Sequence, residues 1–453
     1  MQPSAVRELF ETVLPREFIQ AQSVRLGVQR PRRALDPPQM NCALVLRGGT
    51  AEAGHLAAAV REYFDRGGSR VARSAYYRWF DKEFLALMEE LTRRAISYLA
   101  AMPRHLPGIL AGRSDWRVFD STTVRLPDKL REVYSGAGDY AALKVHVELS
   151  LGVENVVAWH VTPAREHDSP HLIVDESRRG TGLIVDLGYV SHELIRRCHE
   201  HDVHLVVRLK DGWNVHLDDE VKASQLREWT ASEELFECFD GAPLSARVDQ
   251  PFGVDVRMGP PKDPVRARLV NVETPQGCRA YLTTVPRDTH DAEAISFLYQ
   301  LRWSIELQNK LAKSCCQLDE ITAERPVAVE ILVHASMLAA MLANAVAHLG
   351  HLDQGAVGDK VKRFDGPPLH AMLIWKCVVA GAWRIADLLA DPSSAAGDWA
   401  FTASRLQHGG QDPNWKRSPS PIDDAKGRNA EGRARWRRRA KPAGGPIKRP
   451  AAK

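Results

Sequence analysis

Apolar positions recur with a helical period through the first 112 residues of the chain. They fall at three- and four-residue steps in AVRELFETVL, in HLAAAVREYFDRG and in FLALMEELTRRAISYLAAM. A connector rich in proline and arginine, QRPRRALDPPQ, interrupts these segments. We therefore predict a helical region over 1–112. Its basic residues could bind DNA, although a charged, solvated loop explains them equally well: Arg25, Arg30, Arg32 and Arg33.

After Arg113 the pattern changes to short, β-branched stretches separated by turn-like loops. WRVFDSTTVRL, LKVHVELSLG and NVVAWHVTPA read as three successive strands. A helical stretch, SPHLIVDESRRG, follows them, and then strand and helix alternate in GLIVDLG, VSHELIRRCHEHD and VHLVVRLKDG. This order predicts an α/β fold over 113–210, with a mixed sheet flanked by helices.

Up to residue 412, the rest of the chain divides into three further regions. Residues 211–288 are irregular and rich in proline and glycine, and predict a β-rich insertion. Helical periodicity returns over 289–325 and again over 326–412, a C-terminal helical region. In the latter, PVAVEILVHASMLAAMLANAVAHLG is apolar nearly all round. We predict a buried helix there and not a membrane span, because Glu330, His334 and Asn344 interrupt it.

Composition and charge limit the possible classes of protein. The chain has 453 residues, of which 44% are hydrophobic, and this excludes disorder throughout. Its seven cysteines include no CxxC pair, so neither a disulfide framework nor a thiolate zinc site is indicated. No signal-peptide core or membrane span is evident, and no GxxxxGK[ST] loop indicates nucleotide use. We expect a cytoplasmic protein.

The net charge of +4 is distributed unevenly along the chain. Residues 413–453 hold 13 Lys and Arg against 3 Asp and Glu, a net of +10, so the preceding 412 residues sum to −6. This segment has few apolar residues to bury, and we predict a disordered basic tail. It could bind polyanions through phosphate contacts, or it could serve only solubility.

Two aspartates stand where apolar strands predominate. Asp120 interrupts the first strand and Asp186 ends the strand LIVDLG, with Gly188 behind it. A carboxylate inside an apolar strand needs a partner or a metal to offset its desolvation. By themselves these two positions leave a structural and a functional interpretation about equal.

A third group lies on one predicted helix. Tyr299, Arg302, Glu306, Lys310 and Lys313 follow one another at steps of three or four, so they should share a face. A solvated stripe of salt bridges would have the same spacing. Together with the two aspartates, however, these residues match the needs of two-metal phosphoryl transfer, in which carboxylates hold Mg²⁺ and cations hold phosphates.

The same residues carry a family resemblance. The spacing of Tyr299, Arg302, Glu306 and Lys313 resembles the Y-R-E-K signature of bacterial DDE transposases of the insertion-sequence-four type. VFDSTTVRLP, GLIVDLGYVSHELI and LYQLRWSIELQNKLAKSCCQLD resemble the segments around the family's two aspartates and its glutamate. The resemblance covers about residues 80 to 350.

The resemblance implies an RNase H-like core with a catalytic and metal-binding triad of Asp120, Asp186 and Glu306. Two Mg²⁺ ions would be the cofactor, with Mn²⁺ as a substitute. The implied DNA contacts are Tyr299, Arg302, Lys310, Lys313 and Lys144. The implied activity is cleavage at the ends of an insertion sequence and joining to target DNA.

The implied partners are double-stranded DNA, as transposon ends and as target, and a second copy of the chain in the synaptic complex. The helical region 1–112 would recognise the terminal repeats, and no membrane or nucleotide cofactor is implied. The place of action would be the bacterial cytoplasm, at the nucleoid. Two alternatives are a catalytically silent DNA-binding protein and an RNase H-like nuclease without strand transfer.

Four details concern individual residues. Leu187 and Asn309 stand where the family often has an arginine and an aromatic residue. Trp213 or Trp229 could stack on an extruded base, although core packing is the simpler interpretation. A zinc site formed by Cys198, His199, His201 and His204 is disfavoured, since they would not all face one way. Near His167 and His171, Asp168 or Ser169 is expected to cap a helix.

Overall fold

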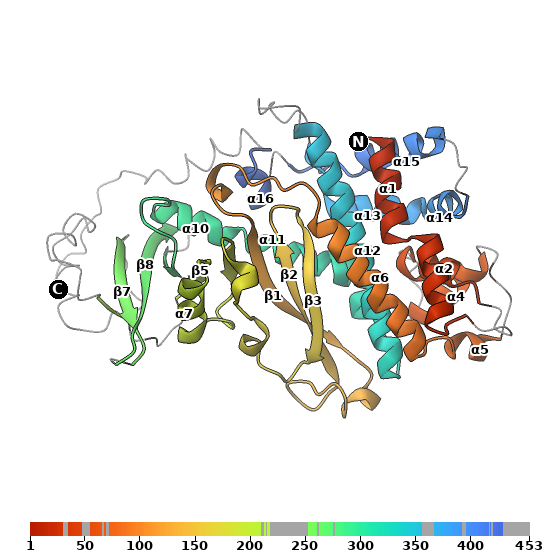
Figure 1. Cartoon of the computed structure of the whole chain (residues 1–453), viewed down its shortest axis with the longest axis horizontal. Coiled ribbons are helices and arrows are strands. Elements are labelled where there is room, and N and C mark those ends of the chain that lie inside the picture. The colour runs from red at the N-terminus through yellow and green to blue at the C-terminus, as the bar shows by residue number, and fades with distance from the viewer. Residues whose placement is uncertain are drawn as a thin grey trace, which may run out of the picture.

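A computed structural model gives the arrangement of the chain, a broad sheet with a thick layer of helices along one side (Figure 1). It describes the chain apart from residues 30–34, 48–54, 66–67, 69–71, 210–212, 214, 218–251, 261, 275–276, 356–366, 392–395, 416, 418–419 and 429–453. Arg30, Arg32, Arg33 and Trp229 therefore lie outside the described residues.

The described strands form one nine-stranded sheet of order β3-β2-β1-β4-β5-β9-β8-β7-β6. β1 runs parallel to β4, and β4 parallel to β5, whereas β1, β2 and β3 are antiparallel neighbours. Three meandering strands followed by two parallel ones make an RNase H-like core, as predicted. The strands are β1 Trp116–Arg125, β2 Ala142–Ser150, β3 Asn155–Pro163, β4 Gly182–Val185, β5 His204–Arg208, β6 Val215–Leu217, β7 Phe252–Met258, β8 Val265–Thr274 and β9 Gly277–Thr283.

The described strands of the 211–288 region extend the core sheet. β9 pairs with β5 in antiparallel register, and β8, β7 and β6 follow outward (Figure 1). β7 and β8 also contribute apolar side chains to the same hydrophobic cluster as β4, β5 and α7 (His192–Glu200). The insertion is therefore continuous with the core, through pairing between segments far apart in the sequence.

The two faces of the central strands differ in chemistry because side chains alternate along a strand. On β2, Leu143, Val145 and Val147 belong to the large hydrophobic core shared with the helices. Lys144 and His146 alternate with them and point to the other face. All nine residues of β2 are buried, so even its polar side chains need partners inside the protein.

The helices from both ends of the chain pack on the apolar face as one layer. α6 begins at an N-cap, where Asp81 accepts a hydrogen bond from the amide of Phe84 at 3.0 Å. α12 packs against α6, α1 and α13, and α1 packs against α15. The helices of this layer are α1 Pro3–Val13, α2 Arg16–Arg25, α3 Pro37–Val45, α4 His55–Asp65, α5 Arg73–Tyr77, α6 Lys82–Ala100, α12 Pro326–Gly355, α13 Ala371–Ala380, α14 Ala382–Ala390 and α15 Ala396–Gly409.

Helix α12 is long and apolar enough to cross a membrane, but 78% of its most apolar window is buried inside the protein. It lies between α6, α13 and β3 in the centre of the helical layer (Figure 1). This matches the prediction of a buried core helix. The regions 1–112 and 326–412 thus share one hydrophobic core with the sheet, and neither stands apart as a module.

Outside the acidic site, two sequence-based expectations about secondary structure were wrong. The stretch 169–180 forms two short 3-10 turns, η3 Ser169–His171 and η4 Glu176–Arg178, instead of a helix. Between them Leu172 and Val174 are buried while Ile173 is exposed, an alternation that favours extended chain.

The second concerns the start of the basic tail. Ser420 caps a short helix, α16 (Pro421–Ala425), by accepting a hydrogen bond from the amide of Asp423 at 3.2 Å. Lys426 and Arg428 behind it are buried and form ion pairs with Glu154. Buried ion pairs thus order a segment whose composition resembles a disordered tail, while residues 429–453 lie outside the described part.

Candidate active site

Asp120 and Asp186 are brought together by the parallel pairing of β1 and β4. Phe119 is the register partner of Val185, so the residues that follow them, Asp120 and Asp186, come side by side. Asp120 accepts a hydrogen bond at Oδ1 from the amide of Ser121 at 2.9 Å. The parallel register of β1 and β4 therefore explains why two aspartates far apart in the sequence lie next to each other.

The third acidic residue comes from a segment that is more irregular than predicted. The expected single helix is divided into α10 (Ala292–Gln300), α11 (Trp303–Lys310) and a π-helical turn over Leu311–Cys315. The break after α10 lies between Tyr299 and Arg302, and the π turn contains Lys313. The five residues therefore do not share one continuous helical face.

Arg302 connects the acidic groups electrostatically. Its guanidinium lies 3.7 Å from Asp120 Oδ2, also forms an ion pair with Glu306, and sits over the Tyr299 ring at 5.9 Å. The Tyr299 hydroxyl donates to Asp186 Oδ1 at 3.3 Å. Three carboxylates from β1, from the end of β4 and from α11 thus meet around one cation and one phenol.

The environment of Asp120 disfavours its charge. The pKa of Asp120 is raised to about 6, chiefly by burial and also by the neighbouring Asp186 and Glu306 carboxylates, against the lowering effects of the Ser121 amide and Arg302. Carboxylates that repel one another in a partly desolvated place favour either a proton or a cation. The donor set, oxygen atoms only, is one that Mg²⁺ prefers.

The predicted lysines are placed less uniformly. Lys313 donates to the carbonyl of Thr123 at 2.9 Å and forms an ion pair with Asp319 at 3.2 Å, at the far end of β1. Lys310 is exposed at the end of α11. Lys144 is buried, and forms an ion pair with Asp168 at 2.9 Å and a hydrogen bond to the carbonyl of Glu166 at 2.8 Å. Lys144 was expected to contact DNA, whereas its ammonium group is paired inside the protein.

Asp168 is a residue whose part the sequence-based interpretation misjudged. It provides no side-chain cap for η3, and its Oδ1 accepts a hydrogen bond from the Ser121 hydroxyl at 2.8 Å. Ser121 follows Asp120, so Asp168 and Lys144 support the strand next to the acidic site from the opposite face of the sheet. The sequence signal for such buried polar contacts is the alternation of polar and apolar residues along β2.

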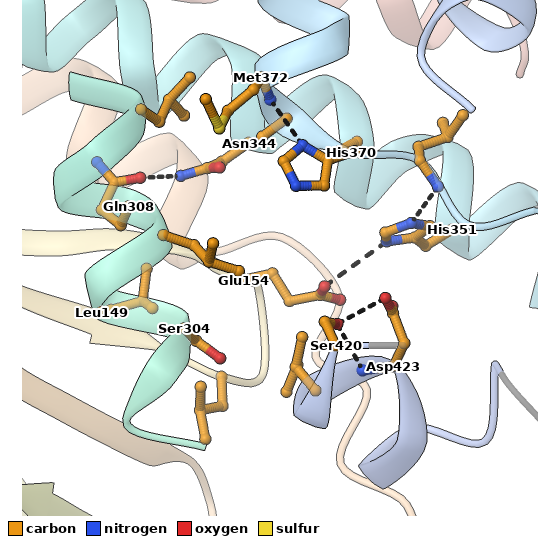
Figure 2. A pocket seen from close by; sticks show the side chains of 17 residues that line it. Leu149, Glu154, Ser304, Gln308, Asn344, His351, His370, Met372, Ser420 and Asp423 are labelled. Carbon is orange, nitrogen blue, oxygen red and sulfur yellow. Dashed lines mark hydrogen bonds and ion pairs between the residues drawn. The ribbon is translucent and has the colours of Figure 1, made fainter. Parts of the chain in front are cut away.

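Helix α11 also lines a cavity on the side away from the acidic residues. The cavity has a volume of about 110 Å³ and lies between α11, α12, α13 and α16, with Ser304 and Gln308 from α11 along one wall (Figure 2). Gln308 accepts a hydrogen bond from Asn344, and Glu154 and His351 form an ion pair at 3.6 Å at its other end. The C-terminal segment therefore packs behind the helix that carries Glu306.

Three members of the disfavoured cysteine and histidine group have different surroundings. His199 contacts the carbonyl of Arg266 at 2.7 Å, His201 pairs with Glu176 at 3.3 Å, and the thiol of Cys198 is buried in the core. Among the cysteines whose side chains the structure describes, five are free thiols: Cys42, Cys198, Cys315, Cys316 and Cys377. Trp213 packs beside the ring of His192 at 4.6 Å.

Comparison with known proteins agrees with this geometry. Residues 112–342, half of the chain and all three acidic residues among them, match the family model of the transposase DDE domain. The chain belongs to the transposase DDE domain family. Within this family the signature at Tyr299, Arg302, Glu306 and Lys313 agrees with the insertion-sequence-four type.

The alignments with individual relatives cover only parts of the chain. It is 38% identical over 79 residues to the transposase for insertion sequence element IS421 of Escherichia coli, which is 17% of this chain and 21% of that protein. It is 21% identical over 271 residues to the transposase for insertion sequence element IS231F of Bacillus thuringiensis subsp. israelensis, 51% of this chain and 56% of that one. The chain thus spans about a fifth to about half of these relatives.

Among solved structures, the piggyBac transposase in a synaptic complex with hairpin DNA has a TM-score of 0.44 and 11% identity to this DDE chain. The alignment covers 89% of this chain and 85% of that one.

Proposed function

We propose that the chain is a DNA transposase that binds the inverted repeats of its insertion sequence, cleaves the DNA there and joins the freed end to target DNA. The observation that supports this most directly is the meeting of Asp120, Asp186 and Glu306 around Arg302, within a DDE family domain. We further propose that these three carboxylates are the catalytic and metal-binding residues.

Two Mg²⁺ ions, or Mn²⁺ in their place, would be held by these carboxylates and would stabilise the attacking and leaving oxygens of an in-line displacement. The oxygen-only donor set and the unfavourable charge on Asp120 fit such ions. Arg302 keeps the carboxylates together in their absence, because its guanidinium already pairs with Asp120 and Glu306.

The surrounding residues would position the DNA. Arg302 is free to contact a phosphate once cations compensate the carboxylates, and the exposed Lys310 lies on the same helix. Tyr299 orients Asp186 through its hydroxyl, and Lys313 would contact DNA at the end of β1. For Lys144 we propose a different role, that of holding Asp168 and the loop after β3 in place.

The partners would be double-stranded DNA, as transposon ends and as target, and a second copy of the chain, since two ends must be held together. The helical region 1–112 would recognise the terminal repeats, with Arg25 exposed at the end of α2. The reaction would take place on nucleoid DNA in the cytoplasm. These proposals rest on family membership and on the site, and each is open to direct measurement.

The test is a nicking and strand-transfer assay with purified protein, Mg²⁺ and DNA that carries the inverted repeats of the insertion sequence. We expect Asp186→Asn to reduce Mg²⁺-dependent nicking by more than about 100-fold, because this substitution removes a metal ligand. Asp175→Asn is a matched control, since Asp175 is exposed and caps the turn η4. It should nick as the unaltered chain does.

Each outcome decides between the proposed function and an alternative. DNA binding without Mg²⁺-dependent nicking would assign the chain to catalytically silent DNA-binding proteins. Nicking without joining would indicate an RNase H-like nuclease. Nicking that survives Asp186→Asn would show that the triad is not the catalytic group.

A further inference from the structure

Three histidines gather on the face of the sheet opposite the acidic site. His146 on β2 and His160 on β3 are direct cross-strand partners, so both side chains point to the same face. His171 reaches them from the turn η3, and ring nitrogens of all three lie within 4.8 Å of one another. The ring centroid of His146 is 4.7 Å from that of His160 and 4.4 Å from that of His171.

The hydrogen bonds of His146 leave one of its nitrogens with a bare lone pair. Its Nε2 lies 3.1 Å from the Thr162 hydroxyl, and that hydroxyl donates its own proton to the carbonyl of Pro163 at 3.3 Å. Thr162 therefore accepts from Nε2–H, and this fixes the tautomer in which Nδ1 carries no proton. Histidines that bind metals are held in this way, with the second nitrogen donating to a fixed acceptor.

This Nδ1 atom is buried and has no hydrogen-bond partner among the described residues. Asp168 Oδ1 lies 3.9 Å from it and is an acceptor as well. That oxygen already accepts from the Lys144 ammonium and the Ser121 hydroxyl and has no proton to offer, so the buried lone pair of Nδ1 stays without a donor. Burial and the neighbouring imidazoles also lower the pKa of His146 to about 4, so the ring is neutral near pH 7 and competent as a ligand.

We propose that His146, His160 and His171 form a binding site for one divalent transition-metal ion, Zn²⁺ by its ligand chemistry, separate from the acidic triad. Imidazole nitrogens select Zn²⁺ over Mg²⁺, and the carboxylate of Asp168 or a water completes a tetrahedral set. Bonds of about 2.0 to 2.1 Å would draw the nitrogens to roughly 3.4 Å of one another, which requires the stacked rings of His146 and His160 to turn toward a common point.

Two further features make such a site accessible and useful. His160 is exposed and His171 half-buried, so an ion can enter from solvent, and Glu166 Oε2 lies 3.1 Å from His171 Nε2 to orient that ring. A bound ion would tie β2, β3 and the turn η3 together. The same turn follows Asp168, which supports Ser121 next to the acidic site. The ion would thus be structural, and it would stabilise the sheet on the face opposite the acidic site.

The test uses Co²⁺ as a spectroscopic probe with the full chain, freed of metal by a chelator and kept in excess Mg²⁺. We expect one Co²⁺ per chain with the strong visible absorption of a tetrahedral site, and displacement by Zn²⁺. His160→Ala should weaken Co²⁺ binding at least about 100-fold, because it removes one of three protein ligands. His160 is exposed, so this substitution leaves the folded core unchanged.

The matched control is the double variant His199→Ala with His201→Ala, which removes two histidines of the unrelated group on and after α7. It should keep the absorption and the affinity, and so should Asp186→Asn, whose loss of nicking concerns the proposed function alone. Absence of tetrahedral Co²⁺ absorption, or its persistence in His160→Ala, would overturn the metal site. A second readout is the melting temperature, which Zn²⁺ should raise in the unaltered chain and leave unchanged in His160→Ala.

Discussion

At the scale of single residues, Arg302 is the group on which the acidic site depends in the absence of metal. Its guanidinium pairs with Asp120 and Glu306 from two different elements. A positive charge in this place competes with any divalent cation for the same carboxylates. The residue therefore has two opposite effects, since it preserves the geometry of the site and weakens its affinity for metal.

Replacing Arg302 by glutamine should separate these effects. Without the competing cation, we expect Mg²⁺ to bind roughly threefold to tenfold more tightly, as measured by thermal shift or calorimetry on the DNA-free protein. Nicking should nevertheless fall, because glutamine cannot pair with a DNA phosphate as a guanidinium does. Arg125→Gln is the control: Arg125 lies on the same strand as Asp120, but its guanidinium stacks on Tyr140 at 5.2 Å. Unchanged or weaker Mg²⁺ binding in Arg302→Gln would contradict this account.

His334 on α12 is a second residue whose surroundings allow a quantitative expectation. Its Nδ1 lies 2.8 Å from the Thr92 hydroxyl, and its ring packs against Trp159 at 4.6 Å. Burial lowers the pKa of His334 from 6.5 to about 4. The unfolded chain therefore binds a proton that the folded chain excludes, and the free energy of unfolding decreases as the pH falls from about 6.5 towards 4.

This one histidine should account for a loss of about 2 kcal/mol between pH 7 and pH 5. His334→Asn keeps a polar atom near the Nδ1 position and cannot titrate, so the pH dependence of its unfolding free energy should be flatter by that amount. Denaturant unfolding at the two pH values measures it. The exposed His199→Asn variant should keep the full dependence, and an equal slope in both variants would refute the assignment to His334.

At the scale of elements, local patterns in the sequence predicted most of what the structure contains. The alternation in β1, β2 and β3, the two aspartates at strand positions and the buried character of α12 all follow from periodicity, which acts over a few residues. The break between α10 and α11 and the π turn at Leu311–Cys315 were not predictable, because residues at steps of three and four fit a continuous helix as well as an interrupted one.

Long-range pairing was the other part that the sequence could not supply. The pairing of β9 with β5 and the burial of Lys426 against Glu154 join segments separated by tens to hundreds of residues. From composition, residues 211–288 were predicted as a β-rich insertion and residues 413–453 as a disordered tail, and neither prediction contained these contacts. In the candidate site the acidic residues could be named from the sequence, whereas the partners of Lys144 and Asp168 depend on the fold of the loop after β3.

The segment after α16 should act as a latch, which consists of Lys426 and Arg428 paired with Glu154. Glu154 forms ion pairs with both, and these cations hold the pKa of Glu154 well below its usual range against its burial. Glu154→Gln would leave the buried Lys426 without a paired carboxylate and Arg428 with Asp423 alone, and we expect it to lower the free energy of unfolding by about 3 to 5 kcal/mol.

Chemical denaturation of the full chain measures this destabilisation. Glu176→Gln is the control, since Glu176 also pairs with an arginine and a histidine but is exposed, where ion pairs contribute little to the free energy of unfolding. A similar small effect in both variants would show that the latch does not stabilise the fold. A chain that ends after Asp412 should also be destabilised. It lacks Lys426 and Arg428 and leaves Glu154 without these two partners.

At the scale of the whole molecule, charge is separated along the chain. Residues 429–453 carry 9 Lys and Arg and 1 Asp or Glu, a net of +8, and the first 428 residues carry 52 basic and 56 acidic residues, a net of −4. A body with a net negative charge and a self-repelling acidic site cannot attract DNA through its overall field. The DNA binding that we propose must therefore arise from local basic patches, from bound cations and from the basic segment.

Removing residues 429–453 tests this division of roles, and the boundary at Arg428 is essential because it leaves the latch in place. We expect the shortened chain to keep its melting temperature and its Mg²⁺-dependent nicking of inverted-repeat DNA. Its affinity for duplex DNA of unrelated sequence should fall, and the slope of log affinity against log salt should decrease by about 0.9 for each phosphate that the basic segment neutralises. A variant with the nine basic residues changed to glutamine separates charge from length and should behave in the same way. An unchanged salt slope in both would mean that DNA binding depends on the folded body alone.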